Sequence, residues 1–267
     1  FEHGAPGSQN LKLTRKYYTE DMPDGRVKHI VQNITDPDIV PYIPDGIGNS
    51  TDRQRIPAVL IIPGGAFRRL VYNFEGEDVA KWLNSMGIAA FVLECRLPSD
   101  EHDNAEDVPL IDAMRAMRVI RGRAQESTAY ESDVYADYKY KDEYDKLSAR
   151  PDFAVCSYPV ISIDDCIEAG KRYMSEEQVL ERISDGKAKI LHKYNPDKLV
   201  RPDMPPVFIC ETDDDRTTLS ENSVGFYMAA RKAGVSAELH IFRTGGHGYG
   251  CGDDFAQTGE WKVLFTK

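Results

Sequence analysis

Three stretches of this sequence carry residue types that can act together in acyl-transfer chemistry. Pro63-Gly64-Gly65-Ala66-Phe67 follows an apolar run, and its glycines let the backbone turn sharply and present N–H groups to a negative charge. An ordinary strand-to-helix connection would also use such a glycine pair. His247 lies in the glycine-dense loop 245–250, and Asp215 ends a run of three aspartates. A carboxylate such as Asp215 can hold an imidazole in one tautomer, which favours a His247–Asp215 pair.

The elements that must position these groups are strands, since each loop follows a short apolar run. The runs are 57–62, 206–210 and 237–242. Short branched-aliphatic runs bounded by turn residues indicate buried strands of a parallel sheet. The carboxyl ends of parallel strands meet at one edge of the sheet, where ligands bind. We therefore expect all three loops at one rim. Asp213 and Asp214 are expected to be solvated neighbours of Asp215 or charges at a helix N-terminus.

The remaining elements alternate between strands and helices. Two short antiparallel strands are predicted within 11–40, at the edge of the sheet, and buried strands at 88–93 and 153–158. Helical periodicity predicts helices over 74–86, 109–124 and 220–232, and Ser175 to Gln178 has the pattern of a capping box. This order predicts an α/β fold, a mostly parallel sheet with helices on both faces. We expect a single domain over 1–267 with a small helical cap at about 163–204.

Composition excludes several classes of function. The 267 residues contain 33 Lys and Arg against 44 Asp and Glu, a net charge of −11 that disfavours a nucleic-acid partner. No apolar run is long enough to cross a membrane and no signal-peptide pattern is present, so we expect a soluble protein, cytoplasmic or secreted with its signal already removed. The start at Phe1 suggests a trimmed chain or a fragment. Five scattered cysteines and the absence of a second His at ligand spacing from His247 predict no disulfide framework, no metal site and no cofactor.

Taken in order, these motifs resemble the α/β-hydrolases of the acetylesterase and carbohydrate-esterase group, which includes xylan and feruloyl esterases. The resemblance spans most of residues 57–250, on Pro63 to Phe67, Glu75 to Leu83, Gly87 to Leu93, Asp112 to Arg121, Arg150 to Ser162, Pro205 to Ser223 and Gly245 to Gly248. It implies that Asp215 is the triad acid and His247 the general base, and that Gly64, Gly65 and Ala66 form the oxyanion turn. It also implies a substrate that is a small-molecule or polysaccharide-linked acyl ester.

The nucleophile of that family is missing from its usual motif. The family places a serine in Gly-x-Ser-x-Gly between a strand and a helix, and no such motif occurs in this chain. The nearest candidate is Ser127 in 125–129, which lacks both glycines and has no predicted strand before it. We therefore predict that the central nucleophile strand and helix are deleted, and that the strands at 57–62 and 153–158 pair directly.

The missing motif leaves three hypotheses open. The chain is a carbohydrate ester hydrolase by descent, a pseudoenzyme that keeps the scaffold for binding carbohydrate or protein, or an incomplete chain of an active serine esterase. Without its nucleophile, a His–Asp pair cannot form an acyl-enzyme, and removing a triad member leaves about 10³–10⁴-fold catalysis over water.

Overall fold

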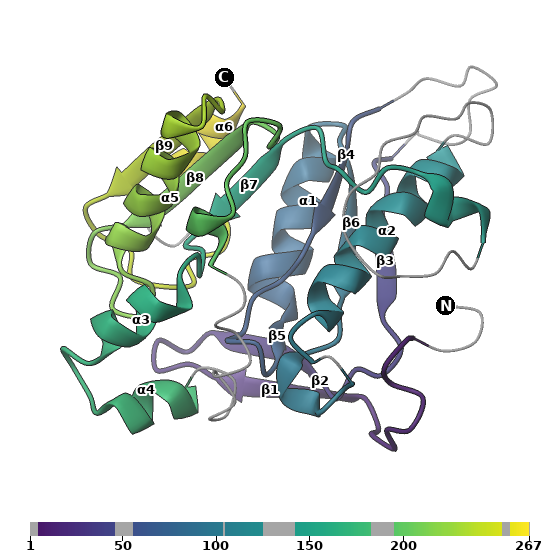
Figure 1. Ribbon diagram of the computed structural model, residues 1–267, viewed down its shortest axis with the longest axis horizontal. Coiled ribbons are helices and arrows are strands. Elements are labelled where there is room, and N and C mark those ends of the chain that lie inside the picture. The colour runs from purple at the N-terminus through teal and green to yellow at the C-terminus, as the bar shows by residue number, and fades with distance from the viewer. Residues whose placement is uncertain are drawn as a thin grey trace. The chain divides into compact units, whose positions relative to one another are not determined.

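The computed structural model describes residues 5–45, 56–103, 105–124, 142–182, 195–252 and 257–266. The chain divides into two compact units, Phe1–Arg150 and Pro151–Lys267 (Figure 1). The expectation of a single domain with a helical cap at about 163–204 stays a prediction. Within the described residues, no helix is long and apolar enough to cross a membrane.

The first unit begins with the predicted antiparallel strands. β1 (Lys16–Asp21) pairs with β2 (Val27–Gln32) around a turn in which Gly25 has φ +86°. β2 also pairs with the two-residue strand β5 (Leu70–Val71). The two strands are confirmed, but their place is different from the one expected. They form a three-stranded sheet of their own with β5, because β5 pairs with the edge of β2 opposite β1.

The second sheet of this unit contains the strand that leads to the double-glycine turn, residues 63–67. β4 (Ala58–Ile61) runs parallel to β6 (Ala89–Glu94), and β3 (Asp38–Tyr42) lies antiparallel on the other side of β6. A π-helical turn (Asn73–Glu77) continues into α1 (Asp78–Ser85), which packs on β6. Gly87 follows the end of α1 at φ +77°, the left-handed conformation that the helix-stop signal predicts.

A buried ion pair joins the end of β6 to α2 (Val108–Ala124). Arg96 is 0% exposed and Asp112 2%. The Arg96 guanidinium donates from Nη2 to Asp112 Oδ1 at 2.6 Å, and the Arg96 backbone N–H donates to Oδ2 at 2.8 Å. Arg96 Nη1 also donates to Ser8 Oγ, so the N-terminal segment is part of the same network. The pair thus links three segments that are distant in the sequence.

The second unit is built on a parallel sheet. β7 (Ala154–Ser157), β8 (Val207–Thr212) and β9 (Ala237–Phe242) lie in that order, and every residue of β8 is buried. α5 (Ser220–Lys232) packs on β8 and β9, as Figure 1 shows, and α6 (Glu260–Phe265) is the last of the described helices. The core between α5 and the sheet consists of buried aliphatic and aromatic side chains: Ile161, Val207, Ile209, Phe226, Ala230 and Val235.

Two short helices follow β7, and their starts are set by side-chain caps. Ser162 Oγ accepts the Asp165 N–H at the start of α3 (Ile163–Gly170). At α4 (Glu176–Arg182), Ser175 Oγ accepts the Gln178 N–H while Gln178 Oε1 accepts the Ser175 N–H. This reciprocal pair confirms the predicted capping box.

The described strands form three three-stranded sheets, whereas the sequence predicted one continuous sheet. Within their sheets β4 and β7 stand at an end, each with one strand partner. The strand at 57–62 was expected to be buried, but the first residue of β4 is exposed, and Ile62, just beyond β4, is 49% exposed. The predicted deletion of the nucleophile strand falls on residues outside the described ranges. The predicted pairing of 57–62 with 153–158 would join one unit to the other, and both stay predictions.

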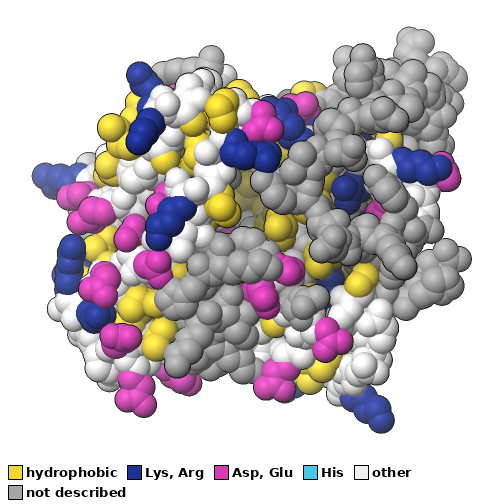
Figure 2. Space-filling model, in the orientation of Figure 1, with side chains coloured by type: hydrophobic (Ala, Val, Ile, Leu, Met, Phe, Trp, Pro, Cys, Tyr) yellow, Lys and Arg dark blue, Asp and Glu magenta, His cyan; other side chains and the backbone are white. Residues whose placement is uncertain are grey.

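Charged side chains of both signs lie on the described part of the face that Figure 2 shows. Figure 2 shows Lys and Arg interspersed with Asp and Glu over the described part of the face in view. That part of the face therefore carries no broad patch of one sign.

Candidate active site

The structure brings His247 and Asp215 together. His247 Nδ1 lies 2.8 Å from Asp215 Oδ2, and the Asp215 side chain is fully buried whereas that of His247 is 33% exposed. With Nδ1–H directed at a carboxylate, the neutral ring is held in the tautomer that leaves Nε2 free to accept a proton. The pair therefore has the geometry of a base and the acid that orients it.

The Asp215 carboxylate is held by the turn that follows β8. Its Oδ1 accepts the backbone N–H groups of Thr217 at 2.6 Å and Thr218 at 3.0 Å, and the Thr218 hydroxyl lies 3.0 Å from Oδ2. Burial works to raise the pKa of Asp215, but the His247 ring and these backbone donors outweigh it and hold the pKa below its ordinary value. Asp215 is therefore ionised beside the imidazole at neutral pH.

The loop that carries His247, residues 245–250 and called the histidine loop below, is hydrogen-bonded to the same turn through Asp214. Asp214 Oδ1 accepts the N–H groups of Gly245 at 3.0 Å and Gly246 at 2.8 Å, and Thr212 Oγ1 donates to the Gly246 carbonyl at 2.8 Å. Gly245 has φ +154°, and a Cβ there would lie 2.4 Å from Thr258 Cγ2, so the loop requires glycine at this position. Asp214 is exposed, as expected of a solvated neighbour of Asp215, and in addition its carboxylate binds the loop that carries His247. The two backbone donors that its carboxylate binds lie 31 and 32 residues further along the chain.

Tyr158, which the sequence did not single out, forms part of the surroundings of His247. It follows β7 at φ +39°, its ring lies 5.2 Å from the imidazole in edge geometry, and its hydroxyl accepts the Gly250 N–H at 3.1 Å. Tyr158 is 8% exposed. A tyrosine directly before a proline at the carboxyl end of a buried strand was the signal available in the sequence, since ligands gather at that edge.

The Thr218 hydroxyl is the most connected uncharged group of the site. It lies 3.0 Å from Asp215 Oδ2, 3.1 Å from His247 Nδ1 and 3.3 Å from the Tyr158 carbonyl. We expect Thr218→Val, which keeps the shape and removes the hydroxyl, to lower the free energy of unfolding by about 1–3 kcal/mol, because buried polar groups lose a partner. Urea denaturation measures the change. Thr217→Val is the matched control, since Thr217 is exposed and binds Asp215 through its backbone; an equal loss in both variants would contradict the prediction.

The double-glycine turn lies in the first unit and is sharply bent. Gly65 has φ +148°, and a Cβ there would lie 2.1 Å from the Arg69 carbonyl oxygen, while Ala66 and Phe67 are left-handed at φ +58° and +59°. The Gly64 N–H donates to Glu75 Oε2 at 2.9 Å. Among the described residues the N–H groups of Gly65 and Ala66 have no acceptor. These two are therefore the available donors of the predicted oxyanion turn.

The other predicted site features are not joined to this geometry. Ser127 lies outside the described residues. The turn belongs to one unit and the His247–Asp215 pair to the other, so their convergence at one rim stays a prediction. In the described ranges, no group of three or more His, Cys, Asp or Glu side chains is arranged to hold a metal ion.

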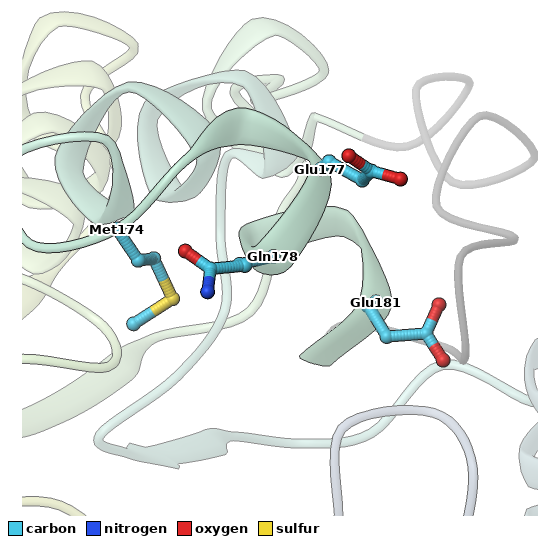
Figure 3. Close-up of a pocket in the computed structure, with 4 residues that line it drawn as sticks. All are labelled: Met174, Glu177, Gln178 and Glu181. Atoms are coloured by element: carbon cyan, nitrogen blue, oxygen red, sulfur yellow. The ribbon is translucent and has the colours of Figure 1, made fainter.

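A hollow of about 560 Å³ lies beside α4 and is lined by Met174, Glu177, Gln178 and Glu181. Figure 3 shows the Met174 and Gln178 side chains pointing toward one another. Glu177 and Glu181 lie on α4, as Gln178 does, whereas Met174 precedes this helix. None of the predicted site residues lines this hollow. Two carboxylates, an amide and a thioether offer no base with an orienting partner, so the hollow does not account for the chemistry expected of the chain.

Comparison with known proteins returns esterases and a xylanase. No protein-family model matches the chain. It is 30% identical over 208 residues to an acetylxylan esterase of Xylanibacter ruminicola, a match that covers 74% of this chain and 42% of that protein. It is 28% identical over 225 residues to endo-1,4-beta-xylanase B of Butyrivibrio fibrisolvens, covering 76% of this chain and 34% of that protein. The chain thus spans less than half the length of these curated relatives.

Solved structures give a match over nearly the whole chain. The acetyl ester-xyloside bifunctional hydrolase from Caldicellulosiruptor lactoaceticus is 32% identical, with a TM-score of 0.65 and coverage of 87% of both chains. A thermophilic esterase from Thermogutta terrifontis, 20% identical, shares the fold at a TM-score of 0.60 over 94% of this chain and 91% of that one. The chain therefore belongs to the α/β-hydrolase superfamily, in its acetylesterase and carbohydrate-esterase group.

Proposed function

We propose that the chain hydrolyses acyl esters of carbohydrates, with His247 as general base and Asp215 as the acid that orients it. The observation that carries the proposal is the 2.8 Å contact between His247 Nδ1 and the buried Asp215 carboxylate. The Gly65 and Ala66 N–H groups are assigned to the carbonyl oxygen of the ester, since backbone donors at a sharp turn stabilise the charge that develops there.

The substrate class comes from the relatives. One of them is named an acetylxylan esterase, another an endo-1,4-beta-xylanase, and the structural match over 87% of both chains is named an acetyl ester-xyloside hydrolase. We therefore assign acetyl and similarly small acyl groups on a xylan-type polysaccharide as the substrate.

The attacking group in this chain is assigned to water, since no Gly-x-Ser-x-Gly supplies a serine. His247 Nε2 takes a proton from the water as its oxygen bonds to the acyl carbon. The tetrahedral intermediate then collapses, the ester C–O bond breaks, and the proton on Nε2 passes to the leaving sugar oxygen. The products are the free acid and the sugar alcohol, and the ring returns to its neutral state. Without a covalent intermediate this route is slow, with rates near those of triad-deficient esterases, about 10³–10⁴-fold over water.

An aryl acetate assay with and without a serine-directed phosphonate tests the proposal. We expect slow turnover that the phosphonate does not inhibit, no phosphonate adduct by mass spectrometry, and the same rate for Ser127→Ala. The substrate class is then checked by measuring acetate release from acetylated xylan and comparing its rate with that for the aryl acetate.

The other hypotheses predict different outcomes. Inhibition together with an adduct on Ser127 would assign the nucleophile to that serine and overturn attack by water. No turnover above the buffer rate, with retained binding of xylan fragments, would make the chain a binding scaffold.

A further inference from the structure

A second carboxyl group, that of Glu211, is buried next to Asp215. Glu211 is in β8, four residues before Asp215, and is 0% exposed. Its Oε1 accepts the Thr212 N–H at 3.0 Å and its Oε2 accepts the Ser223 hydroxyl from α5 at 3.2 Å. Among the described residues no Lys or Arg binds it. An ionised carboxylate with two neutral partners and no cation is costly in such a place.

The two buried carboxyl groups are unequally supplied with donors. Asp215 receives two backbone N–H groups and lies within hydrogen-bond distance of the Thr218 hydroxyl and the His247 ring, four groups in all. Glu211 receives two. Two neighbouring carboxyl groups shielded from water do not both ionise, and the charge goes to the one with more donors. The negative charge therefore belongs to Asp215 and the proton to Glu211.

Titratable groups from each element around Glu211 support this assignment. Burial first, and then the charge of Asp215 and a hydrogen bond to it, raise the pKa of Glu211 to about 9. Burial also raises the pKa of Cys210 in β8 to about 11 and that of Cys166 in α3 to about 12, and it raises the pKa of Tyr249 in the histidine loop. These three are therefore neutral at pH 7. Asp215 is the one anion that faces Glu211 within the described part of the chain.

We propose that Glu211 is a positioning residue that acts as a neutral acid: its carboxyl O–H donates to the Asp215 carboxylate and holds it against His247. Glu211 acts through Asp215 and does not touch the reacting ester. The inference rests on the proposed function only for the catalytic role of the His247–Asp215 pair. The protonation of Glu211 and its hydrogen bond to Asp215 do not depend on whether the protein turns over a substrate.

The proposal fixes the sign of a pH effect on stability. Glu211 loses its proton near the ordinary glutamate pKa of 4.5 in the unfolded chain but keeps it to about 9 in the folded one. Between these two pKa values the folded state binds more protons than the unfolded state, so the folded state loses stability as the pH rises. The equilibrium constant for unfolding increases by up to about tenfold per pH unit. Above about pH 9, Glu211 ionises and repels Asp215, which loosens the contact with His247.

Infrared spectra and the pH dependence of stability of Glu211→Gln test whether Glu211 carries a proton at pH 7. Glutamine keeps an N–H donor toward Asp215 but cannot ionise. At pH 7 we expect the wild-type protein to show the C=O stretch of a protonated buried carboxyl group, titrating near pH 9, and Glu211→Gln to lack it and to lose the fall in stability between pH 5 and 9. Glu238→Gln is the control, since Glu238 is exposed and contacts a different histidine, His240 Nε2, at 2.6 Å. An unchanged stretch and an unchanged pH profile in Glu211→Gln would overturn the proposal.

The positioning role has its own readout, the low-field proton resonance of His247 Nδ1–H. We expect this resonance to persist in Glu211→Gln and Glu238→Gln and to shift upfield or disappear in Glu211→Ala, which has no donor for Asp215. Persistence in a folded Glu211→Ala would overturn the role. If Glu211→Ala does not fold, Glu211→Met keeps the volume without a donor and is measured in its place. None of these spectra requires turnover, so failure of the proposed function leaves the test intact.

Discussion

Asp112→Ala is expected to lower the free energy of unfolding by about 3–5 kcal/mol, because it leaves the Arg96 guanidinium buried without its counter-ion. Arg96 and Asp112 side chains are both 0% exposed, and four of the contacts of Arg96 go to this one carboxylate. Burial raises the pKa of Asp112 even though the Arg96 charge opposes it, which indicates how unfavourable this site is for an unpaired charge. Equilibrium urea denaturation of the intact chain measures the change.

Two variants show whether the loss comes from the buried charge. Glu143→Ala removes a surface pair with Lys146, whose side chains are 86% and 63% exposed, and is expected to change stability by about 0–1 kcal/mol. The double variant Arg96→Met, Asp112→Leu removes both charges and keeps much of the volume, so we expect it to recover most of the loss. A double variant that is no more stable than Asp112→Ala would assign the effect to lost packing.

His247→Ala is expected to lower kcat/KM for an aryl acetate by about 10²–10⁴-fold, the usual contribution of a positioned general base. The ring is partly exposed, bound through Nδ1 to a buried carboxylate that is ionised at neutral pH, and therefore keeps Nε2 for the proton of the attacking water. Asp215→Asn is expected to reduce the rate as well, since an amide in place of the carboxylate no longer selects the Nδ1–H tautomer. Initial rates at pH 7 under saturating and subsaturating substrate give both parameters.

His240→Ala is the matched control for the base. His240 also contacts a carboxylate, Glu238 Oε1 at 2.6 Å, but it lies on the edge strand β9 and its partner is 58% exposed. We expect this variant to retain the wild-type rate. Equal rates in His247→Ala and wild type, above the buffer rate, would exclude His247 as the base while leaving membership of the esterase family untouched.

The elements of this protein follow from local patterns in its sequence. The helix predicted over 220–232 is α5 at Ser220–Lys232, and the capping box at Ser175 forms both of its hydrogen bonds. Helical period and cap chemistry involve neighbours within one or two turns, so the sequence alone determines them. The meeting of His247 with Asp215 was also predictable, because parallel strands β8 and β9 must end at the same edge and bring their loops together.

Contacts between distant segments were decided only by the tertiary structure. The division of the strands among three sheets depends on which edges meet, and strand pairing is a long-range choice that the alternation of residues within a strand does not encode. Asp214 serves the histidine loop, Arg96 is buried against Asp112, and Glu211 carries a proton because of what surrounds each of them in space. Asp, Arg and Glu side chains are solvated charges by default. Burial makes Arg96 half of an ion pair and Glu211 a neutral acid, whereas Asp214 stays exposed and binds two backbone N–H groups of the loop that carries His247.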